Sequence, residues 1–231
     1  MKLVAIHQPN FLPWPGFFHK WMIADAMVLL DTVQFEKNEW QNRNRIKTAQ
    51  GACWITVPVH YRFPQTIREV TVAGGNWRRK LCATVEQAYA KAPHFRRYWP
   101  ELRAVLHEEH EMLAELNVAL IRLVGAWLGC AARLYLASEM GVDESDPTAR
   151  LVALTRAAGG DAYLSGREGR NYLRREAFEA AGLALYFQAV EAPRYPQLHG
   201  PFVSHLSVLD LLFNTGDDAR TLVRDMGGME Q

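Results

Sequence analysis

The sequence predicts an α/β protein built on a layered, mostly parallel sheet flanked by helices. Short apolar runs at residues 2–6 and 26–33 have the length and composition of buried strands. A turn rich in proline and glycine and a short helical segment, 17–24, lie between them. This order opens a parallel sheet, because parallel neighbours require a crossover connection.

The rest of the chain continues this pattern around a helical middle segment, residues 77–129. Residues 34–47 are polar, amide-rich and without periodicity, which indicates a structured functional loop. Elements expected before residue 130 are strands 54–59 and 67–72, helix 77–91, and a helical stretch 94–129 with a solvated acidic turn at 107–111. Elements expected after it are strand 131–137, helix 147–158, strand 162–164, helix 172–181, strand 183–189 and helix 206–226.

Composition limits the classes of function. The 231 residues hold 26 Lys and Arg against 25 Asp and Glu, so the chain has no overall field for nucleic acid or anionic membranes. Its three cysteines form no CxxC pair, which predicts a reduced, cytoplasmic protein without a metal site. No apolar run is long enough to span a membrane. We expect one domain over residues 1–231, with no cofactor specified.

Polar side chains follow the first two predicted strands. His7, Gln8 and Asn10 come after the first strand, and Asp31 and Gln34 come at the end of the second. Ligands of open α/β sheets bind outside the carboxyl ends of the strands, so these side chains are candidates for one site. There, Asp31 would orient His7 as a general base. The alternatives are a capping loop for the first cluster and a turn cap for Asp31.

Two further segments predict contacts with a polar or anionic ligand. The run QNRNRIK holds three cationic and three amide side chains, from which we select Asn42, Arg43 and Lys47. A solvated surface loop is the alternative for this run. The segment YLSGREGRNY is a strand followed by a turn with the features of an anion site, with candidate residues Ser165, Gly166, Arg167, Tyr172 and, further along the chain, Gln197.

Other constellations favour structure over chemistry. Ser207 and Asp210 have the spacing of a helix N-cap and its third helical position, so we interpret both as structural. The chain has no GxSxG or HExxH motif and no diagnostic carboxylate pair, which disfavours hydrolases. Cys53 lies in an apolar strand-like segment, where a thiol is ordinarily inert.

Seven segments, taken in order, resemble the WbqC-like family and span Ile6 to Asn214: IHQPNFLPWPGFF, VLLDTVQF, WQNRNRIK, WITVPV, DAYLSGREGRNYL, YPQ and LSVLDLLFN. The resemblance implies a cytoplasmic protein encoded among enzymes that build surface polysaccharides such as O-antigen, modified sugars or secondary metabolites. It marks as motif positions His7, Gln8, Pro9, Asn10, Asp31, Gln34, Asn42, Arg43, Ser165, Gly166, Tyr172 and Gln197.

The leading functional hypothesis is a transferase that moves an acyl or aminoacyl group to an amine or amino-sugar. His7 would be the general base, and Gln8, Asn10 or Asn42 would stabilise the oxyanion. The expected partners are a small-molecule substrate such as a sugar nucleotide or a carrier-bound thioester, and a carrier protein. A noncatalytic ligand-binding or scaffold subunit is the second hypothesis. A nucleic-acid binder, using WQNRNRIK and residues 77–80, is the third and the least favoured.

Overall fold

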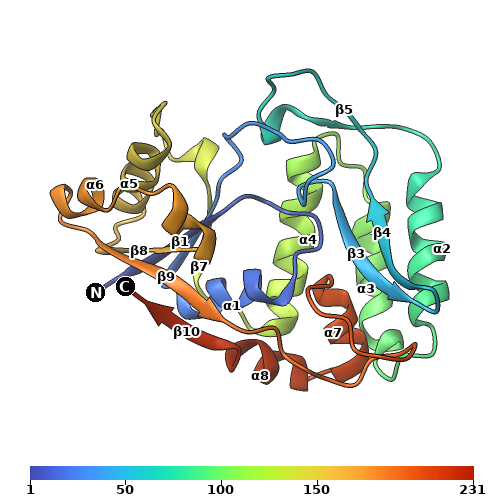
Figure 1. Cartoon of the computed structure of the whole chain (residues 1–231). Helices are drawn as coiled ribbons and strands as arrows, with labels where there is room; N and C mark the ends of the chain where they lie inside the picture. Colours follow the sequence, from blue (N-terminus) through green and yellow to red (C-terminus); the bar gives the residue numbers. More distant parts are fainter.

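A six-stranded, mostly parallel sheet organises the protein (Figure 1), and the computed structural model describes residues 1–231. The strand order is β10-β9-β8-β1-β2-β7, and every neighbouring pair is parallel except β10 with β9. The predicted α/β class and parallel first pair of strands are confirmed. The strands are β1 (Leu3–His7), β2 (Ala26–Leu29), β7 (Arg133–Leu136), β8 (Ala162–Ser165), β9 (Ala184–Val190) and β10 (Gly227–Glu230).

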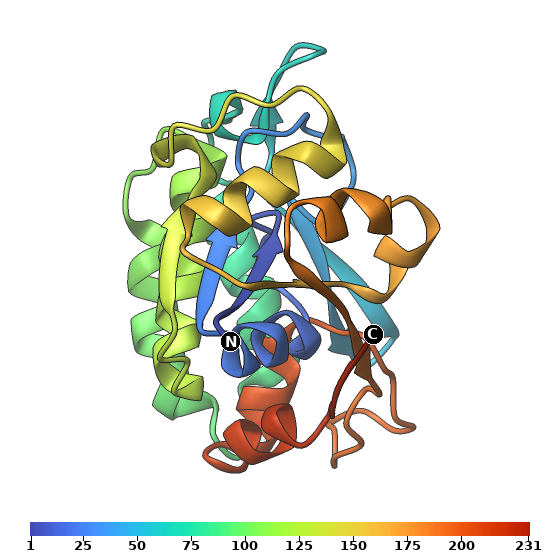
Figure 2. The same cartoon turned by 90° about the vertical axis from the view of Figure 1, so that its left-hand side faces the viewer.

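Helices cover both faces of this sheet. Figure 2 looks onto the face covered by α5 (Pro147–Ala157) and α6 (Arg175–Ala180). The other face packs against α1 (Pro15–Ile23), α4 (Leu113–Leu128) and α8 (Asp218–Arg224). No helix of the structure combines the length and the apolar character needed to cross a membrane.

Two apolar cores result from the alternation of side chains along β1. Leu3 and Ala5 belong to the larger core, which includes α1 and α4, whereas Val4 and Ile6 belong to the smaller core under α5 and α6. Both sets are buried, as expected of a parallel strand covered on its two faces. The continuous apolar run that predicted this strand therefore reflects burial on both sides.

The second half of the fold lies beside the sheet and is centred on a β-hairpin. Strands β3 (Arg43–Thr48) and β4 (Gly51–Thr56) pair antiparallel, with α2 (Trp77–Tyr89), α3 (Phe95–His107) and α7 (Val208–Thr215) packed nearby. The acidic run at 107–111 separates α3 from α4, as predicted. The smaller elements are β5 (Val59–His60), β6 (Thr71–Val72) and the 3-10 turns η1 (Ile67–Glu69), η2 (Ala137–Glu139) and η3 (Arg167–Asn171).

Three sequence-based expectations need correction. The supposed loop 34–47 ends in strand β3, because its alternate residues Asn44 and Ile46 are buried while the amides mask the apolar pattern. The predicted strand 67–72 is mainly a 3-10 turn, with a Thr66 capping box, followed by the short β6. The predicted helix 206–226 is two helices, since Gly216 at φ 60° ends α7.

The final strand β10 was not predicted at all. Its sequence GGME has four exposed residues and two glycines, so it has neither an alternating pattern nor strand propensity. The strand β10 forms through main-chain pairing with β9, in which Gly227 lies opposite Val190 and Glu230 opposite Phe187.

Close contact between α1 and α4 sets the position of α1. Gly125 of α4 faces Trp21 of α1, and a Cβ placed on Gly125 would lie 2.3 Å from the Trp21 ring. The indole Nε1 of Trp21 also donates to the carbonyl of Ala132 at 2.8 Å. The absence of a side chain at position 125 thus allows the two helices to approach.

Replacing Gly125 with Ala should therefore lower the free energy of unfolding by about 1–3 kcal/mol, the usual effect of overpacking a core. Chemical denaturation measures this change. Gly74→Ala is the matched control, because a Cβ there meets no atom within 4 Å. Equal stability of the two variants would show that Trp21 moves aside without cost.

Candidate functional site

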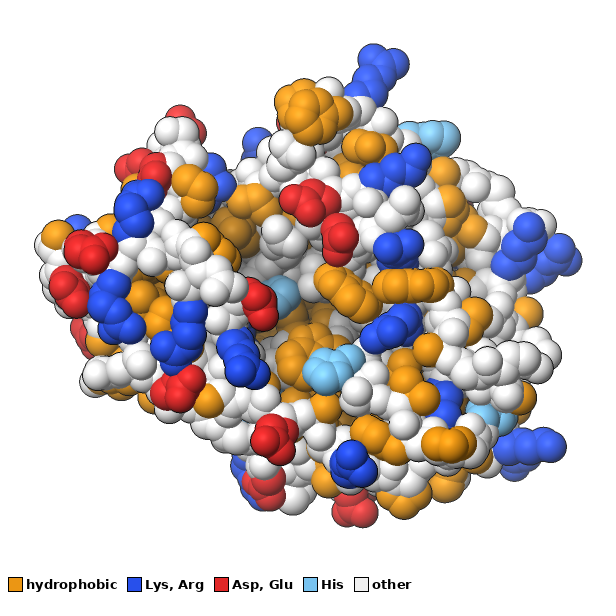
Figure 3. Space-filling model, in the orientation of Figure 1, with side chains coloured by type: hydrophobic (Ala, Val, Ile, Leu, Met, Phe, Trp, Pro, Cys, Tyr) orange, Lys and Arg blue, Asp and Glu red, His pale blue; other side chains and the backbone are white.

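A cavity of about 640 Å³ opens at the carboxyl ends of the parallel strands. Its volume lies in the range of small-molecule sites. The lining comes from β1, α1, α5, β9 and the turn after β8. Figure 3 shows the hollow near the middle of this face, with histidine side chains inside it and at its edge.

Lys20 is the most unusual side chain of the cavity. It belongs to α1, a helix whose sequence PGFFHKWMI is apolar nearly all round and is buried over Pro15 to Trp21. Lys20 is 3% exposed and lines the cavity, yet no hydrogen bond or ion pair to its Nζ exists. Burial lowers the pKa of Lys20 to about 8. The helix therefore holds an ammonium group without a counter-ion in the cavity.

His7 lies at the end of β1, beside Lys20. Its Nδ1 is 3.0 Å from the carbonyl oxygen of Gln8, and a carbonyl only accepts, so Nδ1 carries the proton and Nε2 has a free lone pair. The edge of the Phe17 ring supports the imidazole at 5.0 Å between centroids. Burial, and secondly the charge of Lys20, lower the pKa of His7 to about 3. His7 is thus neutral at physiological pH.

The turn after β8 forms another wall of the cavity. Ser165 is buried, and its Oγ lies against Gly169. A Cβ added to Gly169 would lie 2.0 Å from this oxygen. A Cβ at Gly166 would lie 3.4 Å from the Nζ of Lys20, so the backbone of Gly166 passes beside the ammonium. Arg167 and Tyr172 line the same cavity from exposed positions. The turn after β8 thus contributes Ser165, Gly166, Arg167 and Tyr172 to the lining of the cavity.

Charge at the cavity is net positive. Lys20, Arg150 and Arg167 are the cations of its lining, against one carboxylate, Glu168. The guanidinium of Arg150 donates only to main-chain carbonyls. An anionic ligand is favoured at such a site.

Asp31 does not make the predicted contact with His7. Its Oδ1 accepts from the backbone N–H of Ser138 at 3.0 Å, and its Oδ2 from the hydroxyl of Ser138 at 2.6 Å. The carboxylate therefore ties the end of β2 to the turn after β7. The hydrogen bond that fixes His7 comes from its own neighbour, Gln8.

The predicted amide contacts lie mostly outside the cavity. Gln8 lines it, with Oε1 accepting from Gln41 at 2.8 Å. Asn42 is buried and donates to the carbonyl of Val57 at 3.0 Å. Asn10 is also buried, with no partner for its Oδ1. Gln34 is exposed, forms a β-bridge to Thr66 and does not line the cavity.

Lys47 and Gln197 form hydrogen bonds within the protein and do not line the cavity. The Nζ of Lys47, which is 1% exposed, donates to the carbonyls of Gly200 and Pro201 at 3.2 and 2.6 Å. The amide of Gln197 donates to the carboxylate of Asp210 at 2.7 Å. Ligand binding was predicted for both residues, but their polar groups already have partners within the protein.

Arg43 is the remaining predicted contact, and it does not line the cavity that His7 lines. Its guanidinium carbon lies 4.1 Å from the centroid of the Trp54 ring. The hairpin therefore lies beside the sheet (Figure 1), and its Arg43 lies outside the cavity.

Sequence reasoning missed several residues of the cavity, of which Lys20, Gln188 and His205 matter most. Lys20 had a recognisable signal, since it is a lone cation in an apolar helix that follows the first strand. Gln188 is 6% exposed and donates to the carbonyl of Gly16 at 2.8 Å. His205, at φ 56°, stacks on Trp14 with 5.4 Å between centroids. No local pattern marks either of these two.

No group of three or more His, Cys, Asp or Glu side chains is arranged to hold a metal ion.

Together, the elements and the cavity define an α/β protein with a net-positive cavity at the carboxyl edge of a parallel sheet. The chain belongs to the WbqC-like protein family, whose model matches residues 8–222. It is 37% identical over 229 residues to the "Uncharacterized protein Rv1507c" of Mycobacterium tuberculosis (strain ATCC 25618 / H37Rv), covering 97% of this chain and 98% of that protein. No solved structure matches the chain.

Lys20→Met should stabilise the protein at neutral pH. Below pH 8 the ammonium is charged in the folded and the unfolded chain, so the folded state bears the full cost of desolvation. The fall of the pKa from 10.5 to about 8 corresponds to about 3 kcal/mol. This gain should shrink as pH rises from 8 towards 10.5. In that interval Lys20 of the folded wild type has lost its proton, so its desolvation no longer costs stability.

Denaturation at pH 7 and pH 10 measures this difference, with Lys37→Met, at an exposed position, as the control. A less stable Lys20→Met variant at pH 7 would mean that the ammonium stabilises the fold.

Proposed function

We propose that the protein is a group transferase of bacterial surface polysaccharide or natural-product biosynthesis. It acts in the cytoplasm and moves an acyl or aminoacyl group to an amine, such as that of an amino-sugar. The pathway setting is the one that the resemblance to the WbqC-like family implies, and the chain belongs to that family. The cavity, with its neutral imidazole beside an unpaired ammonium, supports the reaction.

The observation that carries the proposal is the unpaired ammonium of Lys20. Lys20 is buried as a residue and lines the cavity, and burial lowers its pKa. Groups with perturbed pKa values in a cavity are concentrated at functional sites. An anionic group of the substrate, or the oxyanion of a tetrahedral intermediate, would supply the missing partner. Lys20 thus takes the role that the sequence suggested for Gln8, Asn10 or Asn42.

The reaction requires three events in the cavity. The amine nitrogen attacks the carbonyl carbon of a carrier-bound thioester, while the Nε2 of His7 accepts a proton from the amine. The carbonyl electron pair moves to oxygen, and Lys20 stabilises the resulting negative charge. Collapse of this intermediate expels the thiolate, which takes the proton back from His7 and leaves as a thiol. The products are an amide and the free thiol of the carrier.

Binding of an anionic ligand would also make His7 a stronger base. The charge of Lys20 is one cause of the low pKa of His7. An anion placed against Lys20 neutralises that charge, so the pKa of His7 rises in the complex. The substrate therefore prepares the imidazole to accept a proton.

A noncatalytic ligand-binding or scaffold subunit is the second candidate function. One observation favours it, since a pKa of about 3 makes His7 a weak base in the free protein. The same cavity would then bind an anionic ligand without converting it.

His7→Gln should abolish the transferase reaction and leave the cavity intact. Loss of a general base lowers turnover by about 10²–10⁴-fold. The measurement is the amount of acylated polysaccharide or product in a deletion strain complemented with the variant. His60→Gln, at an exposed position in the short β5, is the control. Near-normal output from the His7 variant would instead establish the noncatalytic subunit.

Anion binding should weaken as pH rises through about 8. The Lys20 ammonium is present below its pKa and absent above it, so sulfate should bind about tenfold less tightly at pH 9 than at pH 7. The rise in unfolding temperature with sulfate concentration reports the affinity. The Lys20→Met variant should bind sulfate weakly at both pH 7 and pH 9. If the wild type binds sulfate equally tightly at pH 7 and pH 9, cations other than Lys20 bind the sulfate.

A further inference from the structure

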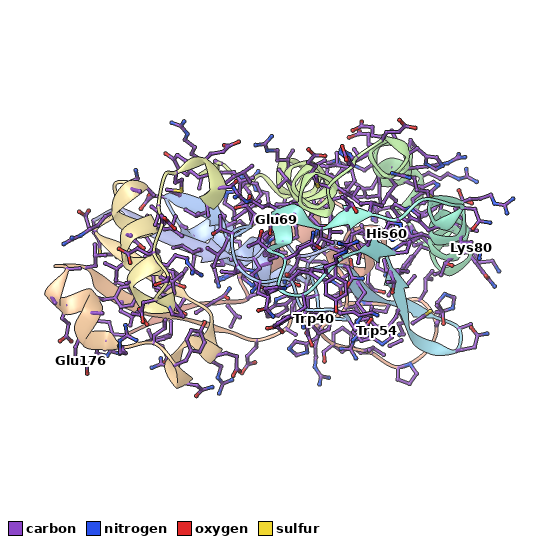
Figure 4. All side chains as sticks on the ribbon, turned by 90° about the horizontal axis from the view of Figure 1, so that it is seen from above. Trp40, Trp54, His60, Glu69, Lys80 and Glu176 are labelled. Atoms are coloured by element: carbon purple, nitrogen blue, oxygen red, sulfur yellow. The ribbon has the colours of Figure 1, made fainter.

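Two exposed tryptophans stand side by side near the cavity. Trp40 precedes β3 and is 39% exposed, whereas Trp54 belongs to β4 and is 44% exposed. Their ring centroids are 5.4 Å apart, with the planes tilted by 40°. Figure 4 shows the two residues next to each other on one side of the molecule. Exposed indoles of this kind are unusual unless they contact a partner.

Two arginines of β3 accompany these rings. Arg43 and Arg45 are two residues apart on the strand, so both project from the same face. The guanidinium carbon of Arg43 lies 4.1 Å from the Trp54 centroid, and that of Arg45 lies 5.8 Å from Trp54 and 5.9 Å from Trp40. Neither arginine forms an ion pair, and the Nε of each is buried without an acceptor. Both guanidinium groups therefore lack an anionic partner.

This arginine–tryptophan face, formed by Trp40, Arg43, Arg45 and Trp54, is continuous with the cavity. Arg45 is 3.5 Å from the carbonyl oxygen of His205, and the ring of His205 stacks on Trp14 at the cavity wall. In Figure 3, apolar side chains flanked by basic ones lie next to the hollow. A single extended ligand can thus reach both surfaces.

We propose that the arginine–tryptophan face is a subsite for the nucleotide moiety of a substrate whose reactive end enters the cavity. A nucleobase stacks on the indoles, and phosphate oxygens accept hydrogen bonds from the two guanidinium groups. This inference rests on the proposed function for the reactive end, but the nucleotide subsite is a separate surface.

A small nucleotide fits this face better than a nucleic-acid strand. Two indoles accommodate one or two bases, whereas strand binding uses a longer row of aromatic side chains along a basic groove. The loop before Trp40 holds exposed Glu36, Lys37 and Glu39, so its net charge is negative and would not attract a continuing phosphate chain. The formal net charge of +1 adds no general attraction.

Calorimetric titration with UMP and AMP tests the subsite. Trp54→Ala should raise the dissociation constant at least about fivefold through the loss of stacking. Arg43→Ala should weaken binding of the monophosphates but leave uridine and adenosine unaffected, with an unfolding temperature close to wild type. Arg79→Ala, which removes an exposed cation of α2 outside the cavity, is the matched control and should change monophosphate affinity less than twofold. Arg45→Ala replaces Trp54→Ala if that variant does not fold.

Wild-type protein that binds neither monophosphate, or a Trp54→Ala variant that binds them as tightly as wild type, would overturn the inference. An oligonucleotide that binds more than tenfold tighter than UMP, with steep salt dependence, would also overturn it, in favour of a nucleic-acid interface. The nucleotide subsite and the transferase function can be tested independently of each other. Loss of monophosphate binding in the Trp54 variant, combined with normal pathway output from His7→Gln, would leave the subsite in place and remove the transferase.

Discussion

The carboxylate of Asp210 connects the segments that lie around the cavity and the arginine–tryptophan face. It is fully buried on α7 and accepts hydrogen bonds from Tyr89 at 2.7 Å, Tyr195 at 2.9 Å and Gln197 at 2.7 Å. The hydroxyl of Tyr89 also accepts from the backbone N–H of Lys47 on β3. Burial raises the pKa of Asp210, and its donors oppose that shift. Such a network is stable only when complete, because a buried charge that loses its donors is costly.

This network explains why some motif residues act structurally. The arginines of β3 are held by a hairpin that is joined to α2, α7 and the segment before α7, so their guanidinium groups keep fixed positions. The capping role predicted for Ser207 is confirmed, since its Oγ accepts from Leu209. Asp210 is structural as interpreted, but through its long-range partners. Lys47 and Gln197 donate hydrogen bonds to partners within the protein.

Sequence patterns predicted the sheet well and the site only in part. Buried strands such as β1 and β2 carry a local apolar signal, which gave the parallel order and brought His7, Ser165 and Gly166 to one edge. The orientation of a polar side chain has no such signal. Whether Asp31 faces His7 or Ser138 depends on the packing of β7 against β2, residues about a hundred positions apart in the sequence. The unpaired state of Lys20 is likewise visible only once its surroundings are known.

The placement of β1 between β2 and β8 has a consequence for biosynthesis. Its neighbour β2 leaves the ribosome soon after it, but residue 162 of β8 follows about 130 residues after β2, on the order of 10 s at typical elongation rates. During that interval the face of β1 bearing Val4 and Ile6 lacks its cover from α5 and α6. This apolar face therefore stays without its cover until α5 and α6 have been made, and the cavity, which residues of β8 and β9 line, is completed late.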